Sequence, residues 1–259
     1  MANYKANKFP IITISVDGAV VGYDAMAKAH NLSESNFATE ISVGPDGTLW
    51  AVSTQPDEQE GGNKIYYSDG DGKWTEISES APGGYKISGC ENGSCVYITN
   101  KFELYAIDEQ KDSVKLAENV FGIDYGEGYY WALIPPKPGD EPVVHYSKAG
   151  GKLEWVVFKG NIQASSLSSA GPVCTLLIDE IPSLLILKDM SSKPMFPGIT
   201  QTAMQISSKT TTNAIVSYEV SEEGNQVLVL SASPGEDMAY RPIGNIRASR
   251  VTTSYFIPV

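Results

Sequence analysis

The chain has 259 residues, of which 42% are hydrophobic and 19% charged, with 24 glycines and 15 prolines. This is the composition of a globular protein, long enough for one large β domain or two small ones. A net charge of −12 and a pI near 4.6 give an acidic surface that repels phosphate groups, so nucleic acid and anionic membrane surfaces are not expected partners.

Targeting segments are not evident in the sequence. No apolar run is long enough to insert into a membrane. The first ten residues contain two lysines but lack the apolar core of a signal peptide. We therefore expect either a cytoplasmic protein or the mature form of a secreted one.

The first predicted strands lie near the start of the chain. Residues 11–16 and 20–24 are two β-rich runs joined by the turn Asp17-Gly18, and Asp-Gly between such runs indicates a hairpin. Residues 25–34 follow, and they could form a short helical turn that leads to the next unit.

Residues 41–77 show a repeating unit most clearly. Four short runs of β-branched and aromatic residues are separated by a Pro-Asp-Gly turn, a polar loop at 54–63 and a turn at 69–72. Glycine takes the positive φ that tight turns require, and aspartate bonds its own backbone nearby. The stretch is therefore predicted to be a four-stranded antiparallel meander of about 40 residues, the size of one propeller blade.

The first strand of this unit recurs along the chain. Each copy has an aliphatic residue or alanine followed by a small polar residue or aspartate, at intervals of about 42 residues. The anchor residues are Ile41, Ile87, Ile123, Ala164, Ile206 and Ala248. This regular spacing favours a ring of repeated units over the main alternative, a sandwich of two sheets.

These observations predict one all-β domain, residues 1–259, folded as a six-bladed β-propeller of four-stranded antiparallel blades. Five blades are expected at about 38–83, 84–119, 120–161, 162–201 and 202–244. Two predicted strands follow the fifth blade, and two precede residue 38. We therefore expect residues 245–259 and 10–37 to form the sixth blade together, because closure by both termini leaves no open sheet edge.

The unit at 41–77 resembles the tectonin repeat. The matching residues are Ile41-Ser42-Val43-Gly44, Asp46 to Val52 and Lys64-Ile65-Tyr66-Tyr67, and the other units share their spacing and polarity. The resemblance implies a tectonin-like β-propeller, and several tectonin-type proteins bind glycans. Trp131 falls near the position of Trp50, so glycan sites that depend on this tryptophan are not expected at every blade. The arginine–glutamate–tryptophan arrangement of fungal fucose-binding lectins is not found.

Aromatic side chains are the main candidates for a ligand site. The 14 tyrosines and 4 tryptophans outnumber the 7 phenylalanines, so most rings carry a polar group. A sugar has apolar C–H faces and polar edges, which an aromatic platform beside polar groups would fit. The alternative is that the rings only pack between blades. The candidate ligand-binding residues are Trp50, Tyr66, Tyr97, Tyr105, Tyr130, Trp131 and His145.

Motifs for catalysis or metal binding are missing. The only histidines are His30 and His145, and no nucleophile motif or phosphate-binding loop accompanies them. The run Asp69-Gly70-Asp71-Gly72 resembles the start of a calcium loop but lacks the later ligands, and a hairpin turn is due there. We expect no catalytic residue, no metal and no cofactor.

The three cysteines do not make a disulfide framework. Cys90 and Cys95 flank a predicted turn and could form a disulfide in an oxidising compartment. Two reduced, packed thiols are the favoured alternative. Cys174 lies in an apolar run and is expected in the core.

The favoured function is that of a soluble carbohydrate-binding protein, a lectin with aromatic-lined glycan sites. One alternative is a metal-independent hydrolase or cyclase that acts on a small apolar molecule in the central pocket. Another is a protein-interaction scaffold. A lectin should repeat its polar and aromatic residues in several blades, whereas an enzyme should hold one unrepeated cluster. The expected partner is a glycan or another small molecule, with no nucleic acid and no insertion into a membrane.

Overall fold

The structure is a computed structural model, and it describes residues 9, 11–24, 26, 28–58, 61–77, 81–179 and 181–194. Beyond these it describes the backbone of the strands between residues 203 and 253. All regular structure among these residues is β-strand. In this part of the chain no helix is long and apolar enough to cross a membrane.

The strands are short, as the runs of β-branched residues between turn residues predict. In chain order they are β1 (Ile11–Ile14), β2 (Val20–Tyr23), β3 (Ala29–Asn31), β4 (Ala38–Val43), β5 (Leu49–Pro56), β6 (Asn63–Ser68), β7 (Thr75–Glu76), β8 (Lys86–Gly89), β9 (Cys95–Ile98), β10 (Leu104–Ile107), β11 (Ser113–Ala117), β12 (Gly122–Gly126), β13 (Tyr129–Ile134), β14 (Val143–Lys148), β15 (Val156–Val157), β16 (Ser166–Ala170), β17 (Val173–Ile178), β18 (Ile181–Ile186), β19 (Ser191–Pro194), β20 (Ala203–Ser207), β21 (Asn213–Tyr218), β22 (Asn225–Ser231), β23 (Ala239–Ala248) and β24 (Arg250–Thr253).

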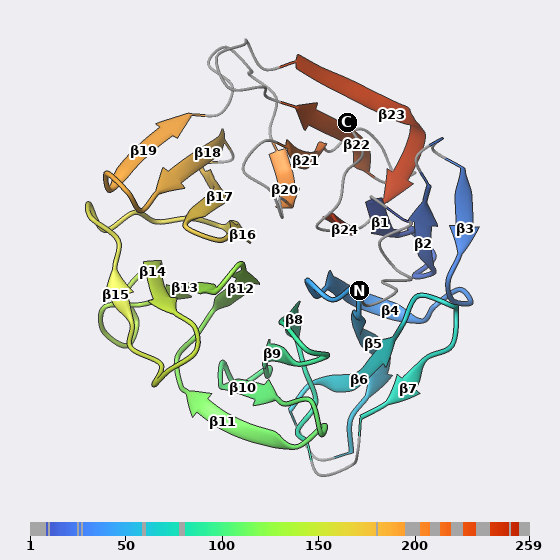
Figure 1. Cartoon of the computed structure of the whole chain (residues 1–259), viewed down its shortest axis with the longest axis horizontal. Helices are drawn as coiled ribbons and strands as arrows, with labels where there is room; N and C mark the ends of the chain where they lie inside the picture. Colours follow the sequence, from blue (N-terminus) through green and yellow to red (C-terminus); the bar gives the residue numbers. More distant parts are fainter. Residues whose placement is uncertain are drawn as a thin grey trace.

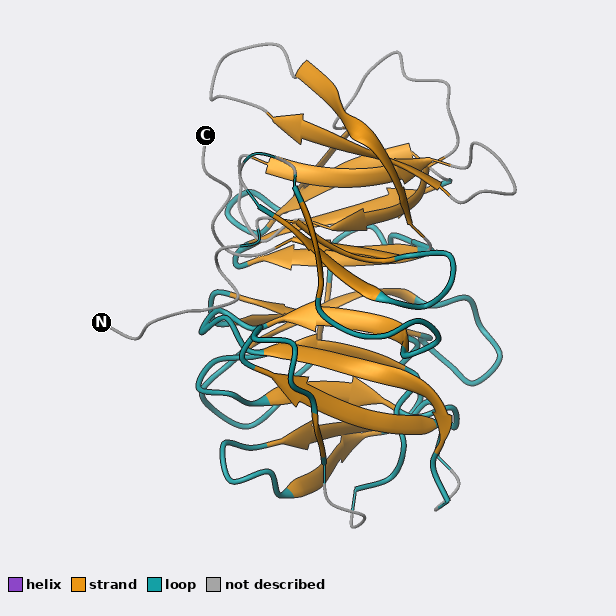
Figure 2. Ribbon diagram, turned by 90° about the vertical axis from the view of Figure 1, so that its right-hand side faces the viewer, coloured by secondary structure: helices purple, strands orange, loops and turns teal. Residues whose placement is uncertain are grey.

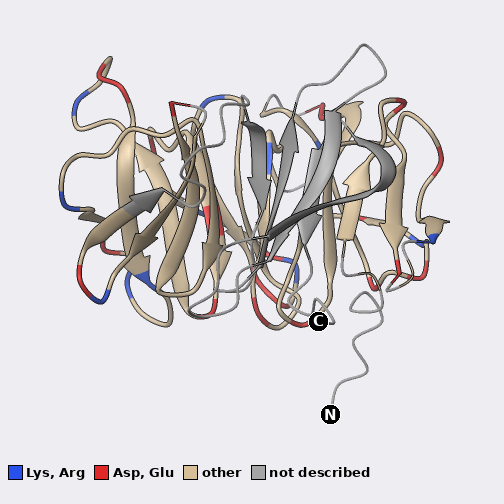
Figure 3. Ribbon diagram, turned by 90° about the horizontal axis from the view of Figure 1, so that it is seen from above, with Lys and Arg blue, Asp and Glu red and all other residues tan. Residues whose placement is uncertain are grey.

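The described strands form six four-stranded antiparallel sheets arranged as a ring (Figure 1). The innermost strands are β4, β8, β12, β16, β20 and β24, and each contacts the next around the ring until β24 meets β4. Turns and connections project from the two faces of the ring (Figure 2). In Figure 3 the ribbon positions of Lys, Arg, Asp and Glu are seen chiefly in these turns and connections.

The prediction of which strands form the last blade of the ring is wrong. Five blades each take four consecutive strands, namely β4–β7, β8–β11, β12–β15, β16–β19 and β20–β23. The remaining sheet, called the closing sheet below, has the order β24-β1-β2-β3. It combines three strands from the start of the chain with one from the end. The six-bladed scheme in which each terminus supplies two strands to the last blade therefore does not hold.

Two local features account for this difference. The helical turn expected at 25–34 is not seen in the described residues of that range, where Ala29–Asn31 pair with β2 as a third strand; residues 25 and 27 lie outside the described residues. Ala248 does not begin a new unit, because it is the last residue of β23 and pairs with Asn225 of β22. The pairing between the two ends of the chain is nevertheless present, since Ile11–Ile14 align with Arg250–Thr253.

Four hairpin turns of five residues share one hydrogen-bond pattern. They span 15–19, 44–48, 99–103 and 108–112, and in each the fourth N–H bonds the first carbonyl. The fourth residue has a left-handed backbone, and it is Gly18, Gly47, Phe102 (φ 60°) or Lys111 (φ 72°). A non-glycine residue costs about 1–2 kcal/mol in this conformation. The side chains of Phe102 and Lys111 therefore need contacts that offset this cost.

The small polar residues of the sequence repeat join neighbouring innermost strands. Ser42 Oγ accepts a hydrogen bond from the N–H of Gly89 at 3.0 Å. Ser88 Oγ accepts one from the N–H of Tyr125 at 2.9 Å. The repeated polar residue thus satisfies a backbone donor of the next blade, which explains why the sequence pattern contains it.

Asp124 holds the corresponding position in β12. Its Oδ1 accepts from the hydroxyl of Ser88 at 2.5 Å, and its Oδ2 accepts from the N–H of Ser169 at 2.7 Å and the hydroxyl of Ser168 at 3.1 Å. These donors compensate the burial of a carboxylate that is only 8% exposed. In β16 the polar position is therefore Ser168 and not the residue after Ala164.

Candidate functional site

Trp50 and Trp131 occupy the same position in two blades. Trp50 pairs with Ser42 across β4 and β5, and Trp131 pairs with Asp124 across β12 and β13. Both side chains are 0% exposed and pack into apolar clusters between adjacent blades. In this structure neither ring offers a face on which a sugar could stack.

The indole N–H groups of the two tryptophans differ. Trp131 donates to the carbonyl of Gly171, in the first turn of the next blade, at 2.9 Å. The first turn beside Trp50 contains Gly93, but the carbonyl of Gly93 accepts from Nζ of Lys111 at 2.5 Å. Nε1 of Trp50 is buried without a hydrogen-bond partner among the described residues. Lys111 therefore takes the acceptor that the geometry of the other blade would offer to Trp50.

Lys111 also lies over an aromatic pair. Its Nζ is 5.2 Å from the ring centroid of Trp50 and 4.8 Å from that of Tyr67, and the two rings are 5.6 Å apart. An ammonium group is attracted to the face of such rings. These contacts offset the left-handed backbone of Lys111 and join blade β8–β11 to blade β4–β7.

Tyr97 and Tyr105 stack on each other at a centroid distance of 5.5 Å. Tyr97 is 0% exposed, its hydroxyl lies 3.1 Å from Oγ of Ser113, and burial raises the pKa of its phenol. Tyr105 is half-buried against the same cluster. The pair packs the space between blades β4–β7 and β8–β11.

Tyr66 and Tyr130 are half-buried. Tyr66 donates its hydroxyl proton to Oε2 of Glu76 at 2.9 Å, and its ring lies 5.4 Å from that of Phe37. The ring of Tyr130 lies 5.1 Å from that of Tyr125, and burial raises the pKa of Tyr130. Each of these two tyrosine side chains therefore packs against another aromatic side chain, Phe37 or Tyr125.

His145 is 8% exposed, and its Nδ1 lies 3.0 Å from the carbonyl oxygen of Val143. A carbonyl can only accept, so Nδ1 carries the proton in this contact. His30 lies on β3 and forms a 2.9 Å contact with Asp24. The seven predicted residues are spread over β5, β6, β9, β10, β13 and β14, and the structure does not gather them at one site.

The cysteines are free thiols, and Cys90, Cys95 and Cys174 are all buried. Burial raises the pKa of Cys95, which keeps its thiol protonated. The alternative of a disulfide between Cys90 and Cys95 is not observed. Among the described residues there is no group of three or more His, Cys, Asp or Glu side chains placed to hold a metal ion.

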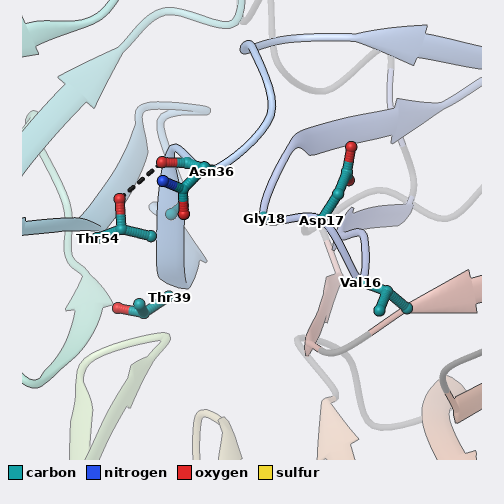
Figure 4. Close-up of a pocket in the computed structure, with 7 residues that line it drawn as sticks. Val16, Asp17, Gly18, Asn36, Thr39 and Thr54 are labelled. Atoms are coloured by element: carbon teal, nitrogen blue, oxygen red, sulfur yellow. Dashed lines mark hydrogen bonds between the residues drawn. The ribbon is translucent and has the colours of Figure 1, made fainter. Parts of the chain in front are cut away.

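A pocket of about 550 Å³ lies between the closing sheet and blade β4–β7 (Figure 4). One wall is the β1–β2 turn, and the other is the start of β4 with the end of β5. Its lining residues are Val16, Asp17, Gly18, Asn36, Ala38, Thr39 and Thr54. The volume lies within the range of small-molecule sites.

The walls of the pocket are fixed by hydrogen bonds. The carboxylate of Asp17 accepts from the hydroxyls of Ser15 and, at 2.6 Å, of Ser35. These hydroxyls lower the pKa of Asp17, so its carboxylate is charged at neutral pH. The hydroxyl of Thr54 donates to the carbonyl of Asn36 at 2.6 Å. The polar groups are thus held in place before a ligand arrives.

The side-chain amide of Asn36 is the group most open to a ligand. Its residue is exposed, and no hydrogen bond of this amide is seen among the described residues. An amide offers both donors and an acceptor. Together with the oxygen atoms of Thr54 and Asp17 it forms a polar surface, and the described lining residues include no lysine, arginine or histidine. Such a surface suits a neutral ligand with several hydroxyl groups.

Sequence reasoning missed this pocket because its residues are small and come from three separate segments. Asp17-Gly18 was predicted only as a turn, and Asn36 and Thr54 fell in connections. One signal was present. Asparagine tolerates a left-handed backbone, and Asn36 (φ 56°) and Asn119 (φ 59°) both stand shortly before a first strand.

No protein-family model matches the chain, and no curated protein matches it. Many solved structures do. A chain of a nidogen–laminin complex has a TM-score of 0.68 at 12% identity, and the match covers 93% of this chain and 97% of the other. TolB from Acinetobacter baumannii has a TM-score of 0.68 at 13% identity, covering 95% of this chain and 67% of TolB.

A catalytically inactive virginiamycin B lyase from Staphylococcus aureus, solved with quinupristin, has a TM-score of 0.52 at 17% identity. That match covers 80% of this chain and 76% of the lyase. The chain is a β-propeller. At these identities the likeness shows the fold alone, and propellers carry many unrelated functions. The function of this propeller has to be argued from its own pocket.

Proposed function

We propose that this propeller is a carbohydrate-binding protein whose ligand site is the pocket between the closing sheet and blade β4–β7. The observation that carries the proposal is the free amide of Asn36, which faces a pocket lined by hydroxyl, amide and carboxylate groups. Sugar hydroxyls both donate and accept hydrogen bonds. The amide can do the same, while Asp17 and Thr54 can accept.

The charge of the pocket favours a neutral ligand. Asp17 is the only ionisable residue among the described residues that line it, and the whole chain carries a net charge of −12. A phosphorylated or carboxylated ligand would meet repulsion without a cationic partner. The resemblance of residues 41–67 to a tectonin repeat supports a glycan as the ligand. The site proposed here does not use Trp50, whose ring is buried.

Binding to a glycan array, followed by calorimetry with the best glycan, tests the proposal. Asn36→Ala should weaken binding by about tenfold or more, because it removes hydrogen bonds worth about 1–1.5 kcal/mol. The matched control is Asn161→Ala. Asn161 is also exposed, also has a left-handed backbone (φ 49°) and also lies in a connection between blades, but it does not line the pocket.

The control separates loss of a ligand contact from loss of a favourable backbone residue. Both variants should lose similar stability, and only Asn36→Ala should lose affinity. Equal affinity in the wild type and Asn36→Ala would place the ligand elsewhere. Absence of binding to any glycan would leave the central-pocket enzyme and the protein-interaction scaffold as the functions to test.

A further inference from the structure

The pocket has a structural counterpart between blades β8–β11 and β12–β15. Gly18 and Phe102 are each the fourth residue of the same type of five-residue turn, which joins the second and third strands of its sheet. The carbonyl of Gly18 accepts from the N–H groups of Phe37 and Ala38 at 3.0 Å. The carbonyl of Phe102 accepts from the N–H of Val120 at 3.0 Å. In both places the turn is thus tied to the connection that enters the next blade.

An asparagine stands near the bound residues in both places. Asn36 precedes Phe37 and Asn119 precedes Val120, so each asparagine stands directly before a residue bound by the turn. Their φ angles are 56° and 59°, and both residues are exposed. The two places therefore share the turn and its bond to the entering connection, while Asn36 stands three residues before Thr39 and Asn119 stands two residues before Phe121, so the two amides are offset by one residue.

The side chains that fill the two frameworks differ. Ile41 pairs with Ala51 and Ile123 pairs with Ala132, which aligns Thr39 with Phe121. Gly18 in the pocket thus corresponds to Phe102 in the counterpart, and Thr39 corresponds to Phe121.

In the counterpart, the rings of Phe102 and Phe121 stack at a centroid distance of 4.1 Å and an interplanar angle of 18°. Two flat rings fill the region that small residues leave open beside Asn36. The stacked phenylalanine rings therefore indicate that flat six-membered rings fit between the turn and the first strand in this arrangement.

We propose that the pocket binds a pyranose ring of its ligand in the place that the stacked rings of Phe102 and Phe121 occupy in the counterpart. The proposal takes the ligand class from the proposed function and adds the orientation of the ligand. The sugar ring lies between the β1–β2 turn and the start of β4, with one edge toward the amide of Asn36. A pyranose chair has two broad faces with C–H groups and equatorial hydroxyl groups around its rim, so this orientation places its hydroxyls beside the polar lining.

A gain-of-site experiment tests this orientation. The double substitution Phe102→Gly with Phe121→Thr gives the counterpart the small residues of the pocket. It also places glycine where the backbone has φ 60°. In calorimetry with methyl pyranosides, the stoichiometry should rise from one in the wild type to two in the double variant. A folded double variant that keeps a stoichiometry of one would overturn the proposal.

The reverse experiment fills the pocket. Thr39 is exposed, so Thr39→Phe introduces the ring of the counterpart without burying a new side chain in the core. It should abolish pyranoside binding while the melting temperature stays near that of the wild type. Gly18 is not used for this purpose, because a Cβ there would lie 3.0 Å from the Cα of Asn36. Undiminished binding by Thr39→Phe would contradict the proposed orientation.

The two proposals fail in different ways. Binding that depends on Asn36 but survives Thr39→Phe would leave the carbohydrate function in place and reject the ring position. Phenol serves as a flat probe that is not a sugar. If phenol bound and Thr39→Phe abolished it, while no pyranoside bound, the carbohydrate function and the pyranose orientation would both fail, and the pocket would be a site for a flat ring that is not a sugar. Binding of neither probe to the wild type or the double variant would reject both.

Discussion

The hydroxyl of Ser88 and the carboxylate of Asp124 join two innermost strands through a 2.5 Å hydrogen bond between residues 36 positions apart. The same hydroxyl accepts from the N–H of Tyr125, so Ser88 serves both strands at once. Closure of a ring of sheets depends on contacts between neighbours, and these residues supply the polar part of that contact.

Asp124→Ala should therefore lower the free energy of unfolding by about 3 kcal/mol, because a buried carboxylate that accepts several hydrogen bonds is lost and its donors remain. Ser42→Ala removes one backbone contact and should cost about 1 kcal/mol. Chemical denaturation followed by circular dichroism measures both. An Asp124→Ala variant as stable as Ser42→Ala would show that the carboxylate does not contribute beyond a single hydrogen bond.

The tryptophans offer a matched pair of substitutions. Trp131→Phe removes the hydrogen bond to Gly171, whereas Trp50→Phe removes an N–H that is buried without a partner among the described residues. We expect Trp131→Phe to be the more destabilising by about 1–2 kcal/mol. Neither change should lower glycan affinity, because both rings are 0% exposed. A selective loss of binding in either variant would restore that tryptophan as a ligand contact.

Lys111 should contribute to stability in spite of its backbone conformation. Lys111→Met keeps the length of the side chain but removes the ammonium from Trp50, Tyr67 and the carbonyl of Gly93. The expected loss is about 1–2 kcal/mol. Thermal unfolding monitored by tryptophan fluorescence measures it. Lys111→Gly relieves the left-handed backbone and should lose less, and a larger loss than in Lys111→Met would contradict the assignment of the stabilisation to the ammonium group.

Acid should destabilise the fold through its paired carboxylates. The pKa of Glu76 is lowered, first by the hydrogen bond from Lys64 and then by that from Tyr66. A lowered pKa in the folded state means that the stabilisation is present above the ordinary glutamate pKa of 4.5 and is lost as pH falls through the folded-state value. Melting temperatures should thus decrease below about pH 4.5, and Lys64→Met should make this decrease shallower. A profile unchanged by Lys64→Met would remove Glu76 from the acid response.

Removal of residues 250–259 should unfold the whole ring rather than one sheet. β24 supplies the innermost strand of the closing sheet and contacts β4, β20 and β21 of its neighbours. Its loss opens an edge on β1 and breaks the circle of innermost strands. We expect one cooperative transition at a lower denaturant concentration, seen alike by circular dichroism and fluorescence. An unchanged transition would contradict the role of β24 in closure.

Much of the fold could be predicted because its signals are local. Asp-Gly turns and alternating β-branched residues mark strands and hairpins within a few positions, and the polar residue after Ile41, Ile87 and Ile123 repeats because each joins adjacent blades. The closing sheet was harder. Its strand β3 is three residues long and carries the sequence Ala-His-Asn, which lacks any β-branched residue.

The site could not be predicted in the same way. Aromatic residues suit sugars, but burial between blades depends on the packing of distant segments and cannot be seen in composition. Trp50 and Trp131 lie at 0% exposure, while Asn36 and Thr54, which line the pocket, have no distinctive local pattern. What identifies them is the approach of the 15–19 turn to the connection before β4.

The closing sheet has a consequence for the protein during its synthesis. β1, β2 and β3 are made before the five continuous blades, but their sheet receives its innermost strand, β24, only after those blades. Until then β1 presents an unpaired edge, and its sequence Ile-Ile-Thr-Ile is strongly apolar. An exposed apolar edge of this kind pairs readily with other chains. The nascent protein is therefore open to misassembly at β1, and a holdase that covers residues 11–14 would protect this edge until β24 is made.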